Sequence, residues 1–335
     1  MKISPFISVI IVSYNYAKYL PRALNALINQ TFKDYEIIIV NNGSTDNTQE
    51  IINKFCAEYP EQRIIVEIVE KNIGLPHGRN VGIAAAKGTY ILFNDADDWM
   101  ECDCLQRLAE KAKETNADRI SGFYQQIDSN NNIYNIVTYH SDMSIWQFYA
   151  LQASMFRRSI FYDNNITCPL DVLIDDLYLS SLFASYTKNN VICNKIIYYC
   201  FYNPNSTFTS EGSKRTIDFI NDYTKTYKML LQKINSVELE YFEYMIIKIY
   251  YFGVFNLNRG CSYSIAVSNY KKARSIMRDN LPNYLNNKKL TLFRKNGDRP
   301  RGRYLTWLLS IFERFHLIYI FWLLFLLVNK IKKNS

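Results

Sequence analysis

The sequence lacks the cysteine and histidine patterns of zinc-binding or disulfide-bonded proteins. Its 335 residues include seven cysteines, an odd number, and no two of them form a CxxC pair. Only three histidines are present and none lies near a cysteine pair, so a zinc site is not expected. No secretory signal precedes the first apolar segment, because "MKISPF" is too short and has no apolar core. These absences favour a reduced, cytoplasmic setting.

No apolar run in the sequence is long enough to cross a membrane. The longest, Leu317–Val328, has 12 residues, whereas a membrane-spanning helix needs about 20. Extending it back to Tyr304 adds Glu313 and Arg314, whose charges are costly inside a bilayer. We therefore expect this end of the chain to lie on a membrane surface or to form a contact in a homo-oligomer.

Excess positive charge is also missing from most of the chain. Residues 286–335 contain 11 Lys/Arg and 2 Asp/Glu, whereas the whole chain has a net charge of +8. Basic side chains beside a leucine- and tryptophan-rich segment fit attraction to anionic lipid. They argue against a nucleic-acid partner, since nucleic-acid binders favour a basic face without a long apolar run. The sequence thus predicts a tail, residues 301–335, that associates peripherally with the cytoplasmic face of the cell membrane.

What the first hundred residues do contain is an alternation of strands and helices. Continuous runs of β-branched residues predict strands buried on both faces. These runs are 7–12, 35–40, 63–69 and 89–93. Helical patterns between them cover 18–30, 44–59 and 76–88. This order predicts an α/β fold with a mostly parallel central sheet flanked by helices.

Polar residues follow each predicted strand. They are "SYN" (13–15), "NNGSTD" (41–46), "EKNIG" (70–74) and "NDADD" (94–98). Ligands of open α/β sheets bind beside the carboxyl ends of the strands. Four polar loops at one edge therefore predict a binding site there.

The fourth loop gathers three carboxylates, Asp95, Asp97 and Asp98. Mg²⁺ and Mn²⁺ prefer oxygen ligands, and a cation would remove the repulsion between Asp95 and Asp97. The alternative is that these aspartates cap a helix predicted over Trp99–Lys113.

Two side chains near these loops allow more than one role. Tyr14 follows a strand and can stack on a nucleobase or simply pack at the sheet edge. Arg79 lies near the start of a predicted helix, where anions are favoured. Arg79 can contact a phosphate, pair with the aspartates or remain solvated. The neighbouring His77 is expected to be an ordinary loop residue.

The stretches "SVIIVSYNYAKYLPRALNALINQTFKDYEIIIVNNGSTDNT" and "NIGLPHGRNVGIAAAKGTYILFNDADDWM" resemble the family 2 glycosyltransferases. The resemblance runs from Ser8 to Met100 and keeps the order and spacing of several motifs. It implies the GT-A fold and a nucleotide-activated sugar donor. The chain resembles the bacterial members that build capsule, lipopolysaccharide or related cell-surface glycans.

The resemblance also implies roles for individual residues. Asp95-Ala96-Asp97 is similar to the D-x-D motif, in which Asp97 would ligate Mn²⁺ or Mg²⁺ and Asp95 would contact the ribose or a metal-bound water, with Asp98 as a helper. Arg79 would lie near the diphosphate. The nucleotide-sugar contacts implied in this way are Ser13, Tyr14, Asn15, Asn42, Asn72, Arg79, Asp95, Ala96 and Asp97.

One departure from the family concerns the nucleotide base. Asn41-Asn42 stands where the family usually has an acidic pair, whose second acid accepts a hydrogen bond from the uracil N–H. An amide oxygen also accepts such a bond, but its NH₂ group can donate one. UDP is the expected nucleotide, and another base stays open.

The catalytic base is expected in "CPLDVLIDDLYLSSLFAS" (168–185), which offers Asp171, Asp175 and Asp176. An inverting transfer needs a carboxylate that takes the proton of the acceptor hydroxyl. The family resemblance assigns this role to the second acid of a pair, Asp176, with Asp175 in support. The alternative is a pair that caps the helix Leu177–Ala184. Arg157 and Arg158 are either acceptor contacts or solvated.

Three regions and two functions follow. Residues 1–215 are predicted to form the GT-A catalytic domain, 216–300 a helical region and 301–335 the tail. The predicted function is an inverting, metal-dependent glycosyltransferase with a UDP-sugar donor and a glycan or lipid-linked acceptor. The alternative is a non-catalytic, sugar-nucleotide-binding partner subunit of a polysaccharide synthase.

Overall fold

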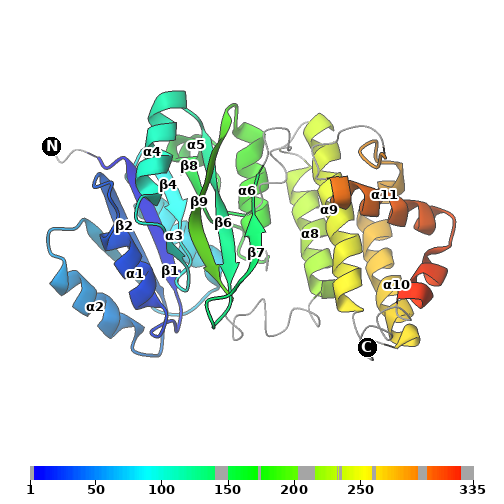
Figure 1. Cartoon of the computed structure of the whole chain (residues 1–335), viewed down its shortest axis with the longest axis horizontal. Helices are drawn as coiled ribbons and strands as arrows, with labels where there is room; N and C mark the ends of the chain where they lie inside the picture. Colours follow the sequence, from blue (N-terminus) through cyan, green and yellow to red (C-terminus); the bar gives the residue numbers. More distant parts are fainter. Residues whose placement is uncertain are drawn as a thin grey trace. The chain divides into compact units, whose positions relative to one another are not determined.

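The chain divides into two compact units, Met1–Ser141 with Phe148–Asn203, and Asp142–Gln147 with Pro204–Ser335. The computed structural model (Figure 1) describes residues 4–139, 150–172, 175–202, 216–231, 233, 236–258, 262–292 and 300–325. Part of the predicted tail, residues 326–335, therefore lies outside the described residues.

The first unit is built on one nine-stranded sheet with the order β3-β2-β1-β4-β8-β6-β9-β5, and β7 pairs with β6. Strands β3, β2, β1 and β4 run parallel, as do β6 and β9, and the remaining pairs are antiparallel. The strands are β1 (Ile7–Ser13), β2 (Tyr35–Asn42), β3 (Ile64–Val69), β4 (Tyr90–Phe93), β5 (Trp99–Met100), β6 (Arg119–Ile127), β7 (Ile133–Val137), β8 (Ser154–Arg157) and β9 (Asn190–Phe201).

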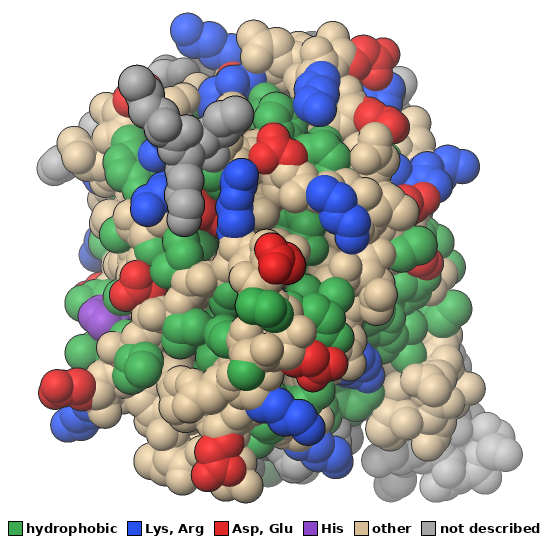
Figure 2. All heavy atoms as spheres, turned by 90° about the vertical axis from the view of Figure 1, so that its left-hand side faces the viewer, with side chains coloured by type: hydrophobic (Ala, Val, Ile, Leu, Met, Phe, Trp, Pro, Cys, Tyr) green, Lys and Arg blue, Asp and Glu red, His purple; other side chains and the backbone are tan. Residues whose placement is uncertain are grey.

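The predicted alternation of strands and helices is confirmed in this unit. Every residue of β2 and β4 is buried, as expected for strands that are covered on both faces. Helices flank the sheet (Figure 1). They are α1 (Leu20–Ile28), α2 (Thr48–Glu58), α3 (Leu75–Ala85), α4 (Cys104–Thr115), α5 (Arg158–Asp163) and α6 (Asp175–Tyr186). Basic and acidic side chains are interspersed on the face shown in Figure 2, which agrees with the low net charge outside the tail.

The helix expected over Trp99–Lys113 begins later than predicted. Trp99 and Met100 form β5, which pairs with Tyr198 and Tyr199 of β9, and α4 starts at Cys104. The interpretation that Asp95, Asp97 or Asp98 caps this helix is therefore wrong, because strand pairing has separated them from it.

Helix α3 packs unusually close to β1. A Cβ atom added at Gly78 would lie 2.4 Å from Cγ1 of Val12, and one added at Gly82 would lie 2.4 Å from Cγ2 of Ile10. Only glycine allows this approach. It sets α3, with Arg79 next to Gly78, directly against the sheet.

The second unit is helical, as the sequence predicts. Its described elements are α8 (Thr216–Leu230), α9 (Ser236–Leu257), α10 (Tyr263–Asn280), the 3₁₀ turn η2 (Tyr284–Asn286), α11 (Pro300–Arg314) and a helical segment at 318–325. Among them, no helix combines the length and apolar character that a membrane span needs.

A buried carboxylate links three helices of the second unit. Glu313 is 1% exposed and pairs with Nε of Arg274 at 2.9 Å. It also accepts hydrogen bonds from the hydroxyls of Tyr250 and Tyr284. The charge that made this segment costly in a bilayer is thus satisfied inside the helical unit.

Candidate active site

The site lies at the carboxyl ends of β1, β2 and β4, where the polar loops converge. The parallel register pairs Ser13 with Asn41, so the loops after β1 and β2 start at the same level. Ser13, Asn42 and Asn94 are all buried there. Ser13 Oγ, Asn42 Oδ1 and Asn94 Oδ1 have no hydrogen-bond partner among the described residues. Three buried acceptors at one edge indicate a site that a polar ligand completes.

Arg79 is the centre of this site. Its side chain is 3% exposed, and its guanidinium reaches three carboxylates. Nη1 lies 2.7 Å from Oδ2 of Asp175 and also contacts Oδ1 of Asp176, and Nη2 lies 3.4 Å from Oδ1 of Asp95. One side chain therefore joins the fourth polar loop to the predicted catalytic pair, which is 80 residues further along the chain.

Local packing explains why these distant segments meet. Asn80, which follows Arg79, exchanges two hydrogen bonds with the backbone of Cys168, at 2.8 and 2.7 Å. This holds the start of the "CPLDVLIDD" segment against α3. Asp175 and Asp176 occupy the first turn of α6, where the helix dipole favours negative charge.

A cluster of four phenylalanine rings packs α6 against the sheet and α5. Phe183 of α6 contacts Phe156 of β8 and Phe161 of α5, with ring centroids 5.0 and 5.1 Å apart. Phe93, the last residue of β4, contacts both of these rings. Because Phe93 nearly adjoins Asp95, the cluster sets α6 and the aspartate loop in a fixed relation.

The ion cluster, which consists of Arg79, Asp95, Asp175 and Asp176, contains three acidic groups and one basic group. Burial raises the pKa of the Asp176 carboxyl to about 7, and the Arg79 guanidinium opposes this shift. Burial by itself would lower the pKa of Arg79, but Asp175, Asp176 and Asp95 raise it well above its usual value. Asp176 is thus poised to exchange a proton near neutral pH, while Arg79 remains charged.

Asp95 is held by two side chains at once. Its Oδ1 faces Arg79, and its Oδ2 accepts a hydrogen bond from Nε2 of Gln152 at 2.9 Å. Ala153, which follows Gln152 in the chain, has φ +53°, a left-handed conformation that is uncommon for alanine. Such strain is found where a structure must aim a neighbouring group.

The backbone of the aspartate loop is fixed from another direction. Nη2 of Arg22 donates to the carbonyl oxygen of Asp97 at 2.6 Å. The same guanidinium lies 3.9 Å from the ring centroid of Trp99 and 4.5 Å from that of Phe201. Cation–π packing on two rings limits the movement of Arg22 and therefore of this loop.

Asp98 takes a different position from its two neighbours. It is 4% exposed, and its Oδ1 accepts a hydrogen bond from the backbone N–H of Phe201 at 2.8 Å. Burial, together with Asp95 and Asp97, raises its pKa well above the usual value. Asp98 thus ties the loop to β9, which is a structural role.

The two asparagines after β2 are used differently. Nδ2 of Asn42 donates to Oδ1 of Asn72 and to the carbonyl of Gly74, at 3.1 and 3.0 Å. These bonds orient the amide and leave Oδ1 as the acceptor. In contrast, Asn41 bonds Gln49 through Nδ2 and the backbone of Ser44 through Oδ1. Asn42 is therefore the one of the two that retains an acceptor for a ligand.

The loop after β1 is braced against the loop after β2. Asn15 has φ +57°, donates through its N–H to Oγ of Ser44 and accepts from the N–H of Thr45 at 2.7 Å. Its side chain is thus engaged within the protein. Tyr14 is 40% exposed at the same edge, as a base-stacking residue would be. Ala96 is 4% exposed within the fourth loop.

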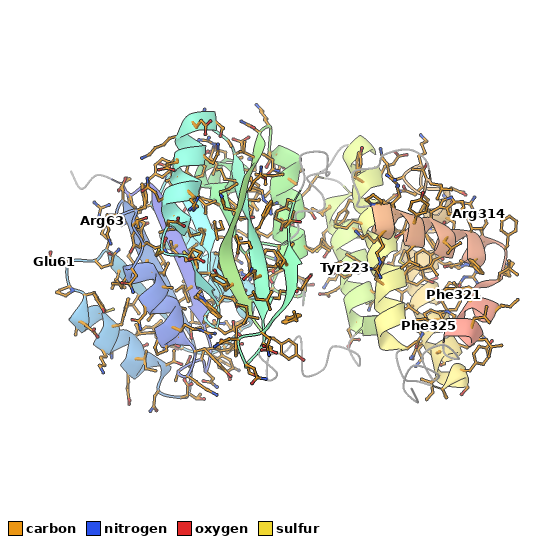
Figure 3. The ribbon with its side chains drawn as sticks, viewed as in Figure 1. Glu61, Arg63, Tyr223, Arg314, Phe321 and Phe325 are labelled. Carbon is orange, nitrogen blue, oxygen red and sulfur yellow. The ribbon has the colours of Figure 1, made fainter. Side chains whose placement is uncertain are left out.

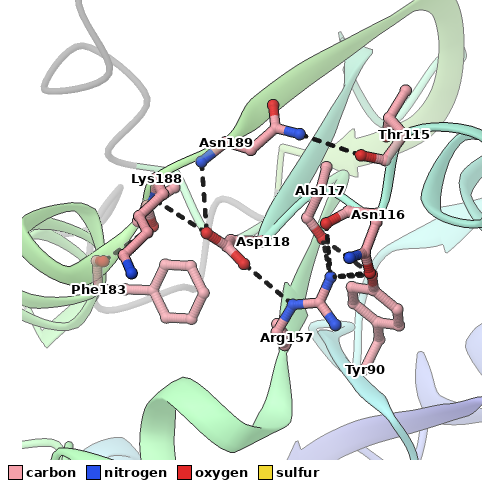
Figure 4. A network of polar contacts seen from close by, with 10 residues as sticks. Tyr90, Thr115, Asn116, Ala117, Asp118, Arg157, Phe183, Lys188 and Asn189 are labelled. Carbon is pink, nitrogen blue, oxygen red and sulfur yellow. Dashed lines mark hydrogen bonds and ion pairs between the residues drawn. The ribbon is translucent and has the colours of Figure 1, made fainter.

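Arg157 and Arg158 are partly exposed and form hydrogen bonds within the protein. Arg157 pairs with Asp118 at 3.0 Å and donates to Tyr90 Oη and to the carbonyls of Asn116 and Ala117 (Figure 4). Nε of Arg158 donates to the carbonyl of Gly88 at 2.6 Å. Both arginines therefore form hydrogen bonds within the first unit, while each residue stays partly exposed. His77 is partly buried within helix α3, so the expectation that it is a loop residue is wrong. Asp171 is exposed.

The residues present fit a divalent cation bound with a diphosphate. Asp95 and Asp97 offer oxygen ligands beside a cluster with surplus negative charge. Within the described part of the chain, no group of three or more His, Cys, Asp or Glu side chains forms a complete metal site. Mg²⁺ typically uses one or two carboxylates plus substrate phosphates, which matches this arrangement.

Sequence reasoning missed the residues that support the site. Gln152, Arg22, Asn80 and Tyr198 support it through hydrogen bonds to partners far away in sequence. Only Asn80 carried a usable signal, since it adjoins Arg79 at the start of a predicted helix.

Comparison with known sequences supports the predicted family. Residues 8–169 match a sequence family described as "Glycosyl transferase family 2". The glycosyltransferase GlyG of Streptococcus pneumoniae serotype 4 is 37% identical over 136 residues, which cover 40% of this chain and 44% of GlyG. The uncharacterized glycosyltransferase EpsJ of Bacillus subtilis strain 168 is 38% identical over 123 residues, which cover 36% of this chain and 35% of EpsJ. The matching stretches span less than half the length of these relatives.

Solved structures share the fold over most of the chain. TarS 1–349 of S. aureus in complex with UDP-GlcNAc superposes with a TM-score of 0.69 at 18% identity, covering 92% of this chain and 91% of that one. The mannosyltransferase PcManGT of Pyrobaculum calidifontis, in complex with GDP-Man and Mn²⁺, gives a TM-score of 0.58 at 13% identity, covering 100% and 89%. The predicted mixed α/β, GT-A-like fold is confirmed.

Proposed function

We propose that this chain, whose residues 8–169 match glycosyl transferase family 2, is an inverting, metal-dependent glycosyltransferase. It transfers a sugar from a nucleotide donor, most simply a UDP-sugar, to a hydroxyl of a glycan or lipid-linked acceptor. Its role is the synthesis of bacterial surface polysaccharide, at the cytoplasmic face of the membrane.

The observation that carries this proposal is the arrangement around Arg79. An acid of the D-x-D loop, Asp95, and the acidic pair of α6 contact the same guanidinium. Donor-binding and proton-accepting groups are thereby within one side chain of each other. An inverting transfer requires such proximity, because the acceptor oxygen must attack the carbon that the diphosphate leaves.

Asp176 is the proposed base. Its side chain is 26% exposed, so an acceptor hydroxyl can reach it. The hydroxyl proton passes to a carboxylate oxygen of Asp176 while the hydroxyl oxygen attacks the anomeric carbon. The bond from that carbon to the diphosphate oxygen breaks on the opposite face, so the configuration inverts. A pKa of about 7 suits proton transfer near neutral pH.

Asp97 and Asp95 are the proposed ligands of Mn²⁺ or Mg²⁺. A bound cation would supply positive charge to the leaving diphosphate. Arg79 adds a fixed positive charge beside Asp95 and holds both acids of α6 in place. The brace of Arg22 on the carbonyl of Asp97 keeps the loop from moving when charge develops.

The preference for UDP rests on the loops after β1 and β2. The free acceptor Oδ1 of Asn42 can receive the N–H of uracil, and the exposed ring of Tyr14 can stack on the base. Ser13, Asn15 and Asn72 line the same edge. One structural neighbour carries UDP-GlcNAc and another carries GDP-Man, so both bases belong in a test.

The test is calorimetric titration of the protein with UDP and GDP, with and without Mn²⁺, together with release of UDP from UDP-sugars. The Asp97→Ala variant should lose Mn²⁺-dependent binding. The Asp176→Asn variant should keep nucleotide binding and lose turnover. Asp163→Asn, an exposed change on α5, is the matched control and should alter neither measurement.

Each contrary outcome has a defined meaning. Tight binding of GDP alone would keep the reaction and change the donor. Normal turnover in Asp176→Asn would remove the proposed base. Nucleotide binding without turnover in the native chain, for every donor and acceptor offered, would favour the non-catalytic partner subunit. Failure of the folded chain to bind any nucleotide would refute the proposal.

A further inference from the structure

The last described helix of the second unit is apolar on both of its faces. Ile318 and Trp322 are 1% and 2% exposed and pack into the unit. Five apolar side chains on and just before this helix are 43 to 64% exposed, and we call them the C-terminal apolar face. They are Phe315, Leu317, Ile320, Leu323 and Leu324. A helix that is apolar all round is normally buried, and an exposed patch of this kind marks an interaction surface.

Aromatic rings make this segment rigid. Phe321 and Phe325 stack with centroids 6.2 Å apart, and Phe321 also packs against Phe312 of α11. Figure 3 shows Phe321 and Phe325 on the final helical segment, with Arg314 at the end of α11. The C-terminal apolar face is therefore presented by an ordered element.

The exposed Lys, Arg, Asp and Glu side chains of the described segment 300–325 are all positive. Arg301 and Arg314 are exposed and Arg303 is partly exposed. The one acid of the described segment 300–325, Glu313, is buried and neutralised by Arg274. A second copy of the chain would bring like charges together, whereas an anionic surface complements them.

We propose that the C-terminal apolar face docks on an anionic phospholipid bilayer. The apolar side chains enter the boundary between headgroups and acyl chains, and the arginines contact the lipid phosphates. In this proposal the segment lies along the membrane surface. This inference does not depend on the proposed catalytic reaction.

Vesicle flotation of the full chain tests the proposal. Vesicles of phosphatidylcholine with an equal part of phosphatidylglycerol should bind the protein at least about tenfold better than phosphatidylcholine alone, and high salt should weaken binding. The double variant Ile320→Gln/Leu324→Gln should lower binding about tenfold or more. The matched control is Ile133→Gln/Ile136→Gln, which changes two exposed isoleucines of β7 in the other unit and should leave binding unchanged.

Circular dichroism, measured in parallel, shows whether a variant is folded. UDP binding, also measured in parallel, tests the proposed donor site separately from membrane docking. Equal binding of the folded Ile320→Gln/Leu324→Gln variant and the native chain would overturn the inference, as would absence of native binding to anionic vesicles. A native dimer that this variant converts to monomer, without vesicle binding, would assign the face to a second copy instead.

Discussion

At the scale of single residues, the site depends on one cation that neutralises several anions. Arg79 is almost fully buried and contacts Asp95, Asp175 and Asp176. The sequence predicted pairing with the aspartates as one of three roles for Arg79. It did not predict that the α6 acids share the same partner, because that contact depends on packing across 97 residues of chain.

Replacing Arg79 should therefore damage both stability and activity. In Arg79→Ala the three carboxylates lose their common partner, and breaking a buried ion pair costs about 3–5 kcal/mol of unfolding free energy. Arg79→Lys should recover only part of this loss, because an ammonium lacks the planar fork of a guanidinium. Urea unfolding and kcat/KM measure the two effects. A stability in Arg79→Ala equal to that of the native chain would contradict the cluster.

Gln152 is expected to act as a positioning residue for Asp95. The hydrogen bond from Gln152 to Asp95 could not be predicted from the sequence. The two residues are 57 positions apart, and no sequence pattern indicates the strained backbone of Ala153. Gln152→Ala should weaken Mn²⁺–UDP binding about fivefold, corresponding to about 1 kcal/mol for one hydrogen bond. Gln152→Glu should weaken it further, because a second carboxylate would face Asp95.

Calorimetry on both variants measures this effect, and Gln126→Ala is the control. Gln126 accepts one side-chain hydrogen bond in the β6–β7 hairpin, away from Asp95. Equal losses in Gln126→Ala and Gln152→Ala would mean that Gln152 has only a general structural role.

The pH dependence of transfer should follow Asp176. With a pKa of about 7, the ionised base is depleted below neutral pH, and kcat/KM should fall about tenfold per pH unit there. The folded-state pKa lies above the unfolded value of about 3.9. The stabilising contribution is thus complete below that value and is lost as the pH rises through about 7.

Asp176→Asn separates the two consequences. The variant should have no transfer activity, and its unfolding free energy should lack the decline between about pH 4 and 7 that Asp176 causes. Unfolding by urea at a series of pH values provides the comparison. A native pH–rate profile that is flat from pH 5 to 8 would argue against Asp176 as the base.

At the scale of elements, sequence periodicity predicted the four parallel strands and their helices. It did not predict the pairing of β5 with β9 or the close packing of α3 on β1, which depend on contacts between distant segments. The two-residue strand β5 pairs with β9 a hundred residues later, so no local pattern reveals it. The glycines of α3 gave no sign that they touch β1. Both features position the loops that form the site.

Gly78→Ala tests the contact between α3 and β1. The new Cβ would lie 2.4 Å from Val12 and 3.4 Å from Asn42, so α3 must shift away from the sheet. We expect a loss of about 1–3 kcal/mol of unfolding free energy and weaker UDP binding, because Arg79 and Asn42 both move. Ala84→Ser, an exposed change on the same helix, should alter stability by less than about 0.5 kcal/mol. Unchanged UDP affinity in Gly78→Ala would separate α3 packing from the site.

At the scale of the whole molecule, the two compact units rest on different physics. The first unit is a sheet covered by helices, with its ion cluster at the site. The second is a set of helices around Glu313, whose sequence position predicted only a charge that is unfavourable in a membrane. The partners of Glu313 could not be predicted from the sequence, because Tyr250, Tyr284 and Arg274 come from separate helical elements.

Glu313→Ala should therefore weaken the second unit selectively. It leaves Arg274 without its carboxylate and two tyrosine hydroxyls without an acceptor, at a cost of about 3–5 kcal/mol. Hydrogen exchange followed by mass spectrometry should show lost protection in α9, α10 and α11 and none in β1 to β4, since Arg274, Tyr250 and Tyr284 all belong to the second unit. Glu240→Gln, which breaks only a 3.6 Å pair with the exposed Lys288, should leave exchange unchanged. If protection fell equally in the strands, the two units would unfold as one, and Glu313 would stabilise the whole chain.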